Sequence, residues 1–289
     1  MNYPKISIVT PSFNQARYLE QTILSIVGQN YPHLEYIIID GGSTDSSVEI
    51  IKKYEKYLAY WESAKDKGHY YAVQKGLEKS TGEIMTYLNS DDILYPYSLF
   101  IIAELFQSYP QIQWIHGIPA HIDEQGKTVR IHTLPKWNKY RYYRYDYKFI
   151  QQEGTFWHRN LWEKAGGYIS TDYELASDLE LWLRFFQYAD FYAINTLIGA
   201  YRLRSANQKS LEQLEAYCKE AENILSNHQL SEQERKELQR IQLIERTLLK
   251  IPILKDWKWL QDRFYYNSLV FRFPPTFDYD RIGQKFFLK

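Results

Sequence analysis

The sequence predicts an α/β protein built on a largely parallel sheet with helices on both faces. Along the first 205 residues, short runs rich in β-branched residues alternate with segments whose apolar residues recur at helical spacing. Most of the runs end at a cluster of Pro, Gly, Asn, Asp or Ser, as strands commonly do. Strands that alternate with helices imply right-handed crossovers and parallel pairing. Apolar residues make up 45% of the 289 residues, which is enough for a sizeable core.

The elements follow one another in a regular order. After the first strand and Pro11, a helix is expected from the spacing of Leu19, Ile23 and Ile26. A second helix is expected after Ser43, where Val48 and later apolar residues share one face. The expected strands are Ile6–Thr10, Tyr36–Ile39, Glu83–Leu88 and Gln113–His116.

The chain changes character after residue 205. Residues 210–250 are charged and favour helices, with a break near Ser226–His228. Ser231 and Glu234 form an S-x-x-E capping box, which predicts the start of a second helix there. The last forty residues show no clear period around Pro274 and Pro275. We therefore expect one α/β domain over 1–205 and a C-terminal helical extension over 206–289.

The composition excludes several classes of protein. Lys and Arg number 35 and so do Asp and Glu, so the formal charge is zero and no nucleic-acid partner is expected. The single Cys218 cannot form a disulfide within the chain. No run reaches the ~18 apolar residues of a membrane-spanning helix, and the N-terminus lacks the layout of a secretory signal. The expectation is a soluble cytoplasmic protein.

Polar residues follow three of the expected strands. They lie at Thr10–Asn14, Asp40–Gly42 and Asn89–Asp92. In open parallel sheets ligands bind outside the carboxyl ends of the strands, so these residues predict one shared crevice. The glycine patterns of dinucleotide-binding folds and of P-loops do not occur, which excludes both.

Two adjacent carboxylates stand at the end of the third strand. Asp91 and Asp92 would repel one another without a cation or a hydrogen-bond donor, and hard oxygen ligands favour Mg²⁺ or Mn²⁺. The alternative is an ordinary pair of acids at a turn or at a helix start, where they meet unpaired amides.

Asp178 is the second candidate. Leu181, Phe185 and Tyr188 give the segment after it a helical face, so Asp178 falls in the first turn. A carboxylate there is held ionised by the helix dipole, as a general base requires, although many helices begin with an acid for the same reason. Glu180 and Arg184 are four residues apart and could form a surface pair.

Four segments together resemble family 2 of the inverting nucleotide-sugar glycosyltransferases, especially bacterial members that build surface polysaccharides. They are Ser7–Gln15, Ile39–Asp45, Asn89–Asp92 and Asp178–Arg184. The resemblance covers about residues 4 to 205. It implies a GT-A fold, a nucleotide-diphosphate sugar donor, a glycan or lipid-linked saccharide acceptor, and a divalent metal, Mn²⁺ or Mg²⁺.

The resemblance also implies a role for particular residues. Phe13 would lie against the nucleotide base, with the backbone of Pro11 and Ser12 close to it. The other donor-side residues would be Asp40 at the base, Asp66 along the donor site and Asp91 at the ribose. The metal would be bound by Asp92, the catalytic base would be Asp178, and the acceptor side would include Glu153 and Trp157.

The chain departs from the family pattern at two positions. Asn89 stands where the family has an Asp, so the metal site has one charge fewer. Arg204 stands where the family often has His, which removes that residue as a metal ligand. Arg202 and Arg204 could instead lie near the diphosphate, or be ordinary surface arginines.

An aromatic and basic stretch at 136–149 allows several interpretations. It holds seven aromatic and five basic residues with a single acid. It could be a tyrosine-rich surface, stack on sugar rings, or contact the inner face of the membrane near an anionic lipid-linked acceptor. Binding of single-stranded nucleic acid is the least favoured, because the chain is neutral.

The function expected from the sequence is metal-dependent inverting glycosyl transfer in polysaccharide biosynthesis. One rival is nucleotidyl transfer to a sugar phosphate, although the chain lacks the glycine- and lysine-rich first loop of that class. Another rival is a sugar-nucleotide or glycan-binding module with decayed catalysis, which Asn89 and Arg204 motivate.

Overall fold

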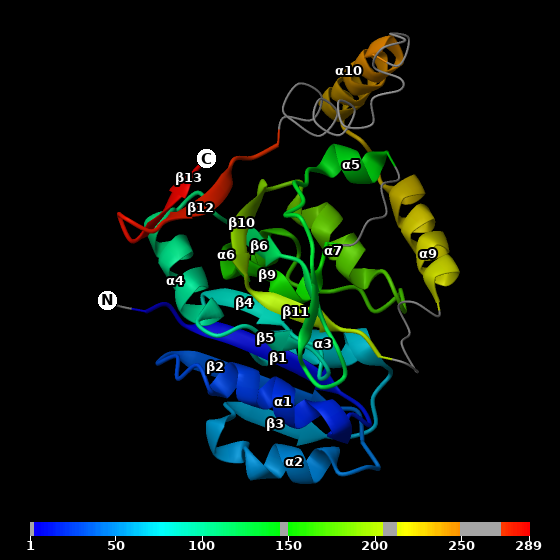
Figure 1. The fold of residues 1–289 in the computed structure, drawn as a ribbon. Coiled ribbons are helices and arrows are strands. Elements are labelled where there is room, and N and C mark those ends of the chain that lie inside the picture. The colour runs from blue at the N-terminus through cyan, green and yellow to red at the C-terminus, as the bar shows by residue number, and fades with distance from the viewer. Residues whose placement is uncertain (1–2, 145–149, 205–212, 249–272) are drawn as a thin grey trace.

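The computed structural model describes residues 3–144, 150–204, 213–248 and 273–289. Within them, a nine-stranded sheet with the order β13-β12-β10-β6-β9-β4-β1-β2-β3 forms the centre of the molecule (Figure 1). Its strands are β1 (Ile6–Ser12), β2 (Leu34–Asp40), β3 (Tyr60–Ser63), β4 (Ile84–Tyr87), β6 (Trp114–Ile118), β9 (Thr155–His158), β10 (Phe191–Leu197), β12 (Thr276–Asp280) and β13 (Lys285–Leu288).

A smaller sheet with the order β5-β11-β7-β8 lies beside the main one. Its strands are β5 (Ile93–Leu94), β7 (Ala120–Ile122), β8 (Thr128–Ile131) and β11 (Gly199–Arg202). The helices are α1 (Ala16–Val27), α2 (Ser47–Lys53), α3 (His69–Lys79), α4 (Ser98–Ser108), α5 (Lys139–Tyr143), α6 (Arg159–Lys164), α7 (Ser177–Phe185), α9 (Leu214–Asn227) and α10 (Glu232–Leu248), with 3₁₀ turns η1 (Glu55–Tyr57) and η2 (Gln152–Gly154).

The main sheet is mostly parallel. β1 pairs in parallel with both β2 and β4, and β2 pairs in parallel with β3. β9 runs antiparallel between β4 and β6. The α/β fold predicted from the sequence is confirmed, and the four predicted strands match β1, β2, β4 and β6, some of them extended by one or two residues.

Alternate residues of the central strands point to opposite faces of the sheet and pack into two separate hydrophobic cores. Ile6 and Ile8 of β1 pack with the apolar faces of α1, α2 and α4 on one side of the sheet. Val9 packs with α3, α6, α7 and α9 on the other. Because both faces are covered, these strands are buried along nearly their whole length, as expected of parallel strands between two layers of helices.

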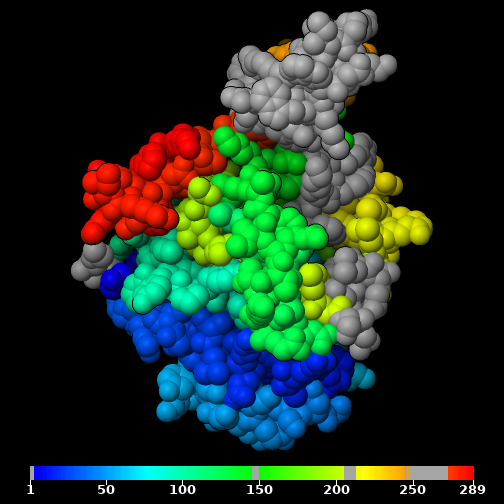
Figure 2. Space-filling view, in the orientation of Figure 1, coloured from blue at the N-terminus to red at the C-terminus, as the bar shows by residue number. Residues whose placement is uncertain are grey.

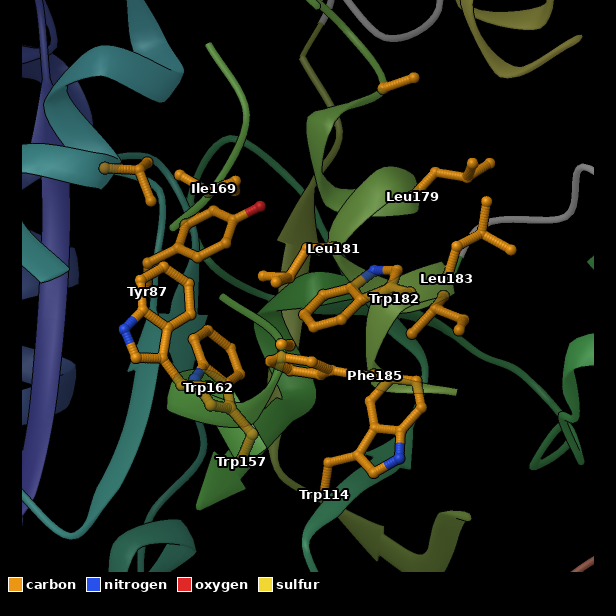
Figure 3. Close-up of a cluster of buried hydrophobic side chains, with 14 of the residues drawn as sticks. Tyr87, Trp114, Trp157, Trp162, Ile169, Leu179, Leu181, Trp182, Leu183 and Phe185 are labelled. Carbon is orange, nitrogen blue, oxygen red and sulfur yellow. The ribbon is translucent and has the colours of Figure 1, made fainter. Parts of the chain in front are cut away.

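The second core is unusually aromatic. Trp114, Trp157 and Trp182 are all buried (Figure 3). The ring centroid of Trp182 lies 5.6 Å from that of Trp114 and 5.7 Å from that of Trp157. Phe185 of α7 packs against all three rings. This cluster fixes α7 against β6 and β9, and therefore sets where the first turn of α7 lies.

The C-terminal segment contains the two predicted helices and a hairpin that the sequence analysis missed. The capping box opens α10 as expected, with Ser231 N donating to Glu234 Oε2 at 2.7 Å and Glu234 N donating to Ser231 Oγ at 3.2 Å. β12 pairs in parallel with β10 and β13 closes the sheet edge. A helical extension is thus an incomplete description of 206–289.

The hairpin is built into the first core. Phe277 and Phe286 are buried there, and Tyr109 donates a hydrogen bond to the Phe286 carbonyl at 2.5 Å. In the space-filling view the hairpin and α4 form a continuous surface (Figure 2).

Three of the four aromatic residues in the described part of the 136–149 stretch are buried. Trp137 and Tyr142 are buried, and the Arg141 guanidinium stacks 3.9 Å from the Trp137 ring centroid. The Tyr143 hydroxyl bonds to Glu234 of α10 at 3.0 Å. These residues join the core to the C-terminal helices, so they offer no exposed stacking surface; residues 145–149 lie outside the described residues.

No helix in the described ranges combines the length and the apolar character needed to cross a bilayer.

A glycine sets the distance between α3 and the central strand. A Cβ at Gly76 would overlap Cγ1 of Val9 in β1. We expect Gly76→Ala to lower the free energy of unfolding by about 1–3 kcal/mol, because overpacking outweighs the ~1 kcal/mol gain in helix propensity. Urea denaturation measures this, with the exposed Glu78→Ala on the same helix as control. A more stable Gly76→Ala variant would contradict the close packing.

Candidate active site

The carboxyl ends of the parallel strands lie level with one another. Ser12 at the end of β1 is opposite Asp40 of β2, and Asp40 is opposite Ser63 of β3. β4 also ends here, so Asn89, Asp91 and the residues between them emerge at the same edge. The structure thus brings the three polar strand ends of the sequence analysis into one region.

The Asp40 carboxylate is buried and holds the loop that follows it. Its Oδ2 accepts hydrogen bonds from Ser63 Oγ at 2.7 Å, Ser43 N at 2.8 Å and Gly42 N at 3.1 Å. Its Oδ1 accepts one from Ser43 Oγ at 2.6 Å. Asp40 therefore shapes the β2 loop; its contact with a nucleotide base stays a prediction.

Phe13 stands out because it is an aromatic side chain left open to solvent at a strand end. It is 59% exposed and precedes Asn14, whose φ is 52°. Asn14 ties this loop to the next one: its N–H donates to Ser43 Oγ at 2.8 Å, and its Oδ1 accepts from Thr44 N at 2.8 Å. The Phe13 ring is thus presented by a braced loop, as stacking on a planar ligand requires.

Three further residues that the resemblance assigns to the donor side lie around this loop. Pro11 is buried in β1, and the Ser12 hydroxyl is buried without a partner among the described residues. Asp66 accepts from Gly68 N at 2.9 Å and lies against Gly41, where a Cβ would be 3.0 Å from its Oδ2. Asp66 and Asp40 thus flank the same backbone.

Asp92 is fully buried and fully engaged with the protein. Its Oδ1 accepts from Arg202 N at 2.8 Å, and its Oδ2 accepts from Asn89 Nδ2 at 3.1 Å. Its pKa is raised well above the usual value by burial, by Asp91 and by Glu153. Asn89, the departure from the family pattern, therefore supplies an amide donor that supports the buried carboxylate.

Glu153 contacts the Asp92 carboxyl. Burial raises the pKa of Glu153 to about 7, although it hydrogen-bonds to Asp92. Two buried carboxyls in such contact favour a shared proton, because both cannot ionise cheaply. Gly199 makes the approach possible, since a Cβ there would overlap the Glu153 carbonyl. The resemblance places Trp157 on the acceptor side together with Glu153. Trp157 lies wholly inside the aromatic core and has no exposed surface.

Asp91 is the more accessible of the two adjacent carboxylates. Arg204 pairs with it at 3.2 Å between Nη2 and Oδ2, and both side chains retain about 15% exposure. Arg204 also lines an open hollow of about 370 Å³. The remaining lining residues are Asp123, Glu124, Gln125, Val129 and Leu203.

Arg202 is buried and binds protein acceptors. Its Nη1 donates to the Asp123 carbonyl at 2.8 Å, its Nη2 to Gln21 at 2.7 Å, and its Nε to the Asp91 carbonyl at 2.5 Å. These contacts hold the Asp91 loop against β11 and α1. A direct contact of Arg202 with the diphosphate stays a prediction.

Asp178 lies in the first turn of α7 as expected. Its Oδ1 accepts from Leu179 N at 2.8 Å, and it hydrogen-bonds to the Tyr70 hydroxyl of α3. Burial raises its pKa to about 6. Glu180 and Arg184 form the predicted pair, with two contacts of 2.7 Å.

The strand-end acids and Asp178 share neighbours. Glu153 is close enough to interact electrostatically with both Asp91 and Asp178. The buried Tyr87, at the end of β4, interacts with Asp178, Glu153 and Asp92. The sequence analysis missed Tyr70 and Tyr87, because neither stands out among 27 tyrosines.

The described residues do not hold three His, Cys, Asp or Glu side chains in an arrangement that would bind a metal on its own. The chemistry of the site fits a cation in another way. Mg²⁺ usually takes one or two carboxylates together with phosphate oxygens and water. Asp91 is a partly exposed carboxylate of this kind and pairs with Arg204 through Oδ2, whereas both oxygens of the buried Asp92 accept hydrogen bonds from the protein.

The fold and the site define an α/β protein in which several carboxylates gather near the carboxyl ends of parallel strands. A model of the family described as "Glycosyl transferase family 2" matches residues 7–162. The chain belongs to this family.

Relatives agree with this assignment. An uncharacterized glycosyltransferase of Haemophilus influenzae is 36% identical over 139 residues, covering 47% of this chain and 55% of the relative. A putative teichuronic acid biosynthesis glycosyltransferase of Bacillus subtilis, TuaG, is 38% identical over 94 residues, covering 31% and 36%. The chain thus spans about half or less of the length of these relatives.

A solved structure shares the fold. Staphylococcus aureus TarS, crystallised as residues 1–349 with UDP-GlcNAc, superposes with a TM-score of 0.64 at 16% identity, covering 92% of this chain and 81% of that one. The mostly parallel fold with GT-A architecture is therefore confirmed.

The raised pKa of Asp178 predicts a stabilising substitution. The Asp178 carboxyl ionises above about pH 4 in the unfolded chain but only above about pH 6 in the folded protein. The free energy of unfolding therefore falls as the pH rises from about 4 to about 6. Asp178→Asn cannot ionise, and we expect it to raise the free energy of unfolding by about 3 kcal/mol at pH 8 and by little at pH 4.

Urea denaturation at the two pH values measures this difference. Asp172→Asn, an exposed residue of the preceding loop, is the control. An equal effect of Asp178→Asn at both pH values would contradict the raised pKa.

Proposed function

We propose that the protein is a metal-dependent inverting glycosyltransferase that moves a sugar from a nucleotide-diphosphate donor to a glycan or lipid-linked acceptor. The observation that carries the proposal is the gathering of Asp178, Glu153 and Asp91 at the ends of the parallel strands. Membership of the family supports the reaction class.

The donor would lie along the strand ends. The exposed Phe13 ring supports stacking on a nucleotide base, and Asp66 and the buried Asp40 frame the loop beside it. Arg204 carries the positive charge that a diphosphate requires close to Asp91. The neighbour TarS was solved with a nucleotide-diphosphate sugar, which supports the same donor class here.

A divalent cation fits best at Asp91. The resemblance assigns the metal to Asp92, but that carboxylate is buried and accepts bonds from Arg202 N and Asn89. We therefore propose Asp91 as the carboxylate that holds Mn²⁺ or Mg²⁺, and Asp92 as the residue that fixes the loop. The cation would offset the charge that develops on the departing diphosphate.

Asp178 would act as the general base. A pKa of about 6 leaves the carboxylate mostly ionised at pH 7 and still able to take a proton from an acceptor hydroxyl. As this oxygen bonds to the anomeric carbon, the bond from that carbon to the diphosphate breaks and the proton passes to Asp178. One such displacement inverts the anomeric configuration.

A glycan acceptor is supported by two observations. The relative TuaG is named for teichuronic acid biosynthesis, a polysaccharide pathway. The open hollow between Arg204 and the β7–β8 turn combines carboxylate, amide and apolar groups, which is the mixture that sugars require.

Turnover measurements test this function. Released nucleoside diphosphate and glycosylated acceptor are measured with a panel of nucleotide sugars and Mn²⁺. We expect Asp178→Asn to lower kcat by at least ~10²-fold with unchanged donor affinity, because only the base is lost. The activity of the parent should fall below about pH 6, where Asp178 takes up a proton.

The rivals give different products. Release of pyrophosphate would show nucleotidyl transfer, and donor binding without turnover would show a binding module. An Asp178→Asn variant as active as the parent would refute the assignment of the base.

A pair of variants tests the metal site. We expect Asp91→Asn to weaken Mn²⁺-dependent donor binding by roughly ten- to a hundredfold, since it removes the accessible charged ligand. Asp92→Asn keeps an acceptor for Arg202 N and should change donor affinity little. Calorimetry with and without Mn²⁺ measures both, and the reverse result would return the metal to Asp92.

A further inference from the structure

Helix α9 lies outside the segment that matches the family, yet it packs on the helix that carries Asp178. The family model ends at residue 162, and α9 begins at Leu214. Tyr217, Ala221 and Ile224 of α9 are buried in the same core as Leu179 of α7. In Figure 1, α9 runs along the outer side of α7.

Glu220 of α9 binds the backbone from which α7 starts. Its Oε2 accepts from Leu175 N and Ala176 N, both at 2.9 Å, and its Oε1 accepts from Glu174 N at 3.1 Å. Helix α7 has no side-chain cap at its own N-cap residue, Ala176. A carboxylate from another helix thus binds the backbone amides of the three residues that lead into α7, and the positive end of the helix dipole favours its charge there.

This anchor is close to the base. Ala176 is two residues before Asp178, so fixing the amides at 174–176 fixes the first turn of α7. Tyr70 strengthens the anchor, because its hydroxyl reaches both Asp178 and the Leu175 carbonyl, the latter at 3.2 Å.

Helix α9 also places a tyrosine, Tyr217, close to Asp178. Tyr217 is buried and close enough to Asp178 for the two to interact electrostatically. The titratable groups that face Asp178 are Tyr70 of α3, Tyr87 of β4, Glu153 of η2, and Tyr217 and Glu220 of α9.

We infer that Glu220 and Tyr217 are positioning residues for the catalytic base, so that the C-terminal segment is part of the catalytic apparatus. The inference rests on the proposed function of Asp178. Glu220 holds the backbone that leads into the first turn of α7, and the buried Tyr217 lies close to the Asp178 carboxyl.

The test compares Glu220→Gln with Glu215→Gln, an equal change on the same helix at an exposed residue that pairs with Lys219. We expect Glu220→Gln to lower kcat about tenfold at unchanged donor KM, because small displacements of a reacting group cost up to ~10² in rate. Glu215→Gln should match the parent.

The pH profile separates positioning from a merely structural role. Burial is the main cause of the raised pKa of Asp178, and the charge of Glu220 adds to it. Removing that charge should move the acid limb of kcat to lower pH, whereas a loss of folded protein would lower the whole profile without moving the limb. ¹³C NMR of the labelled Asp178 carboxyl gives the same shift without turnover.

Tyr217→Phe removes only the hydroxyl group and keeps the buried ring. It tests the inference if Glu220→Gln does not fold. We expect it to lower kcat several-fold with an unchanged fold and donor KM. If the parent is active and both Glu220→Gln and Tyr217→Phe have its kcat and its acid limb, this inference is refuted and the proposed function stands. A parent that releases no nucleoside diphosphate from any donor refutes the proposed function and this inference with it.

Discussion

The parallel pairing of β1 with β2 on one side and β4 on the other is the constraint on which the site depends. It sets Ser12 level with Asp40 and brings the end of β4 to the same edge. Loops that follow parallel strands all leave from one edge, so residues far apart in sequence meet there without any further device. The two cores on either side of the sheet serve to hold this arrangement rigid.

The acids of the site are held at a cost in stability. Asp92, Glu153 and Asp178 all have raised pKa values, and burial is the largest cause for each. A protein selected for stability alone would replace such groups with apolar ones. Their retention agrees with the general opposition between stability and activity at catalytic sites. The aromatic core beneath α7 offers a large buried surface that offsets this cost.

The sequence predicted the strands of the first half and the first turn of α7, because continuous apolar runs and strand-end polar clusters are strong local signals. It predicted the capping box of α10 for the same reason. It did not predict the β12–β13 hairpin, since edge strands that are half exposed show no clear alternation. It also could not tell that Trp137 and Trp157 are buried, because burial depends on which faces meet in space.

The roles of individual site residues were less accessible. A sequence pattern names residue types at a spacing, but it does not say which of two adjacent acids faces the solvent. Here Arg202 N and Asn89 donate hydrogen bonds to the buried Asp92, whereas Asp91 keeps about 15% exposure and pairs with Arg204. Nothing in the sequence indicated that α9 contacts the start of α7, because Glu220 binds backbone amides, which every residue except proline carries.

The pairing of β12 with β10 has a consequence for how the chain acquires its structure. During synthesis β10 emerges long before β12, so the sheet edge beside it remains uncovered for that interval. An open edge with apolar neighbours such as Ile194 can recruit strands of other molecules. Contacts between such distant segments also slow folding. The nascent chain is therefore most vulnerable to self-association while its last strands are still being made.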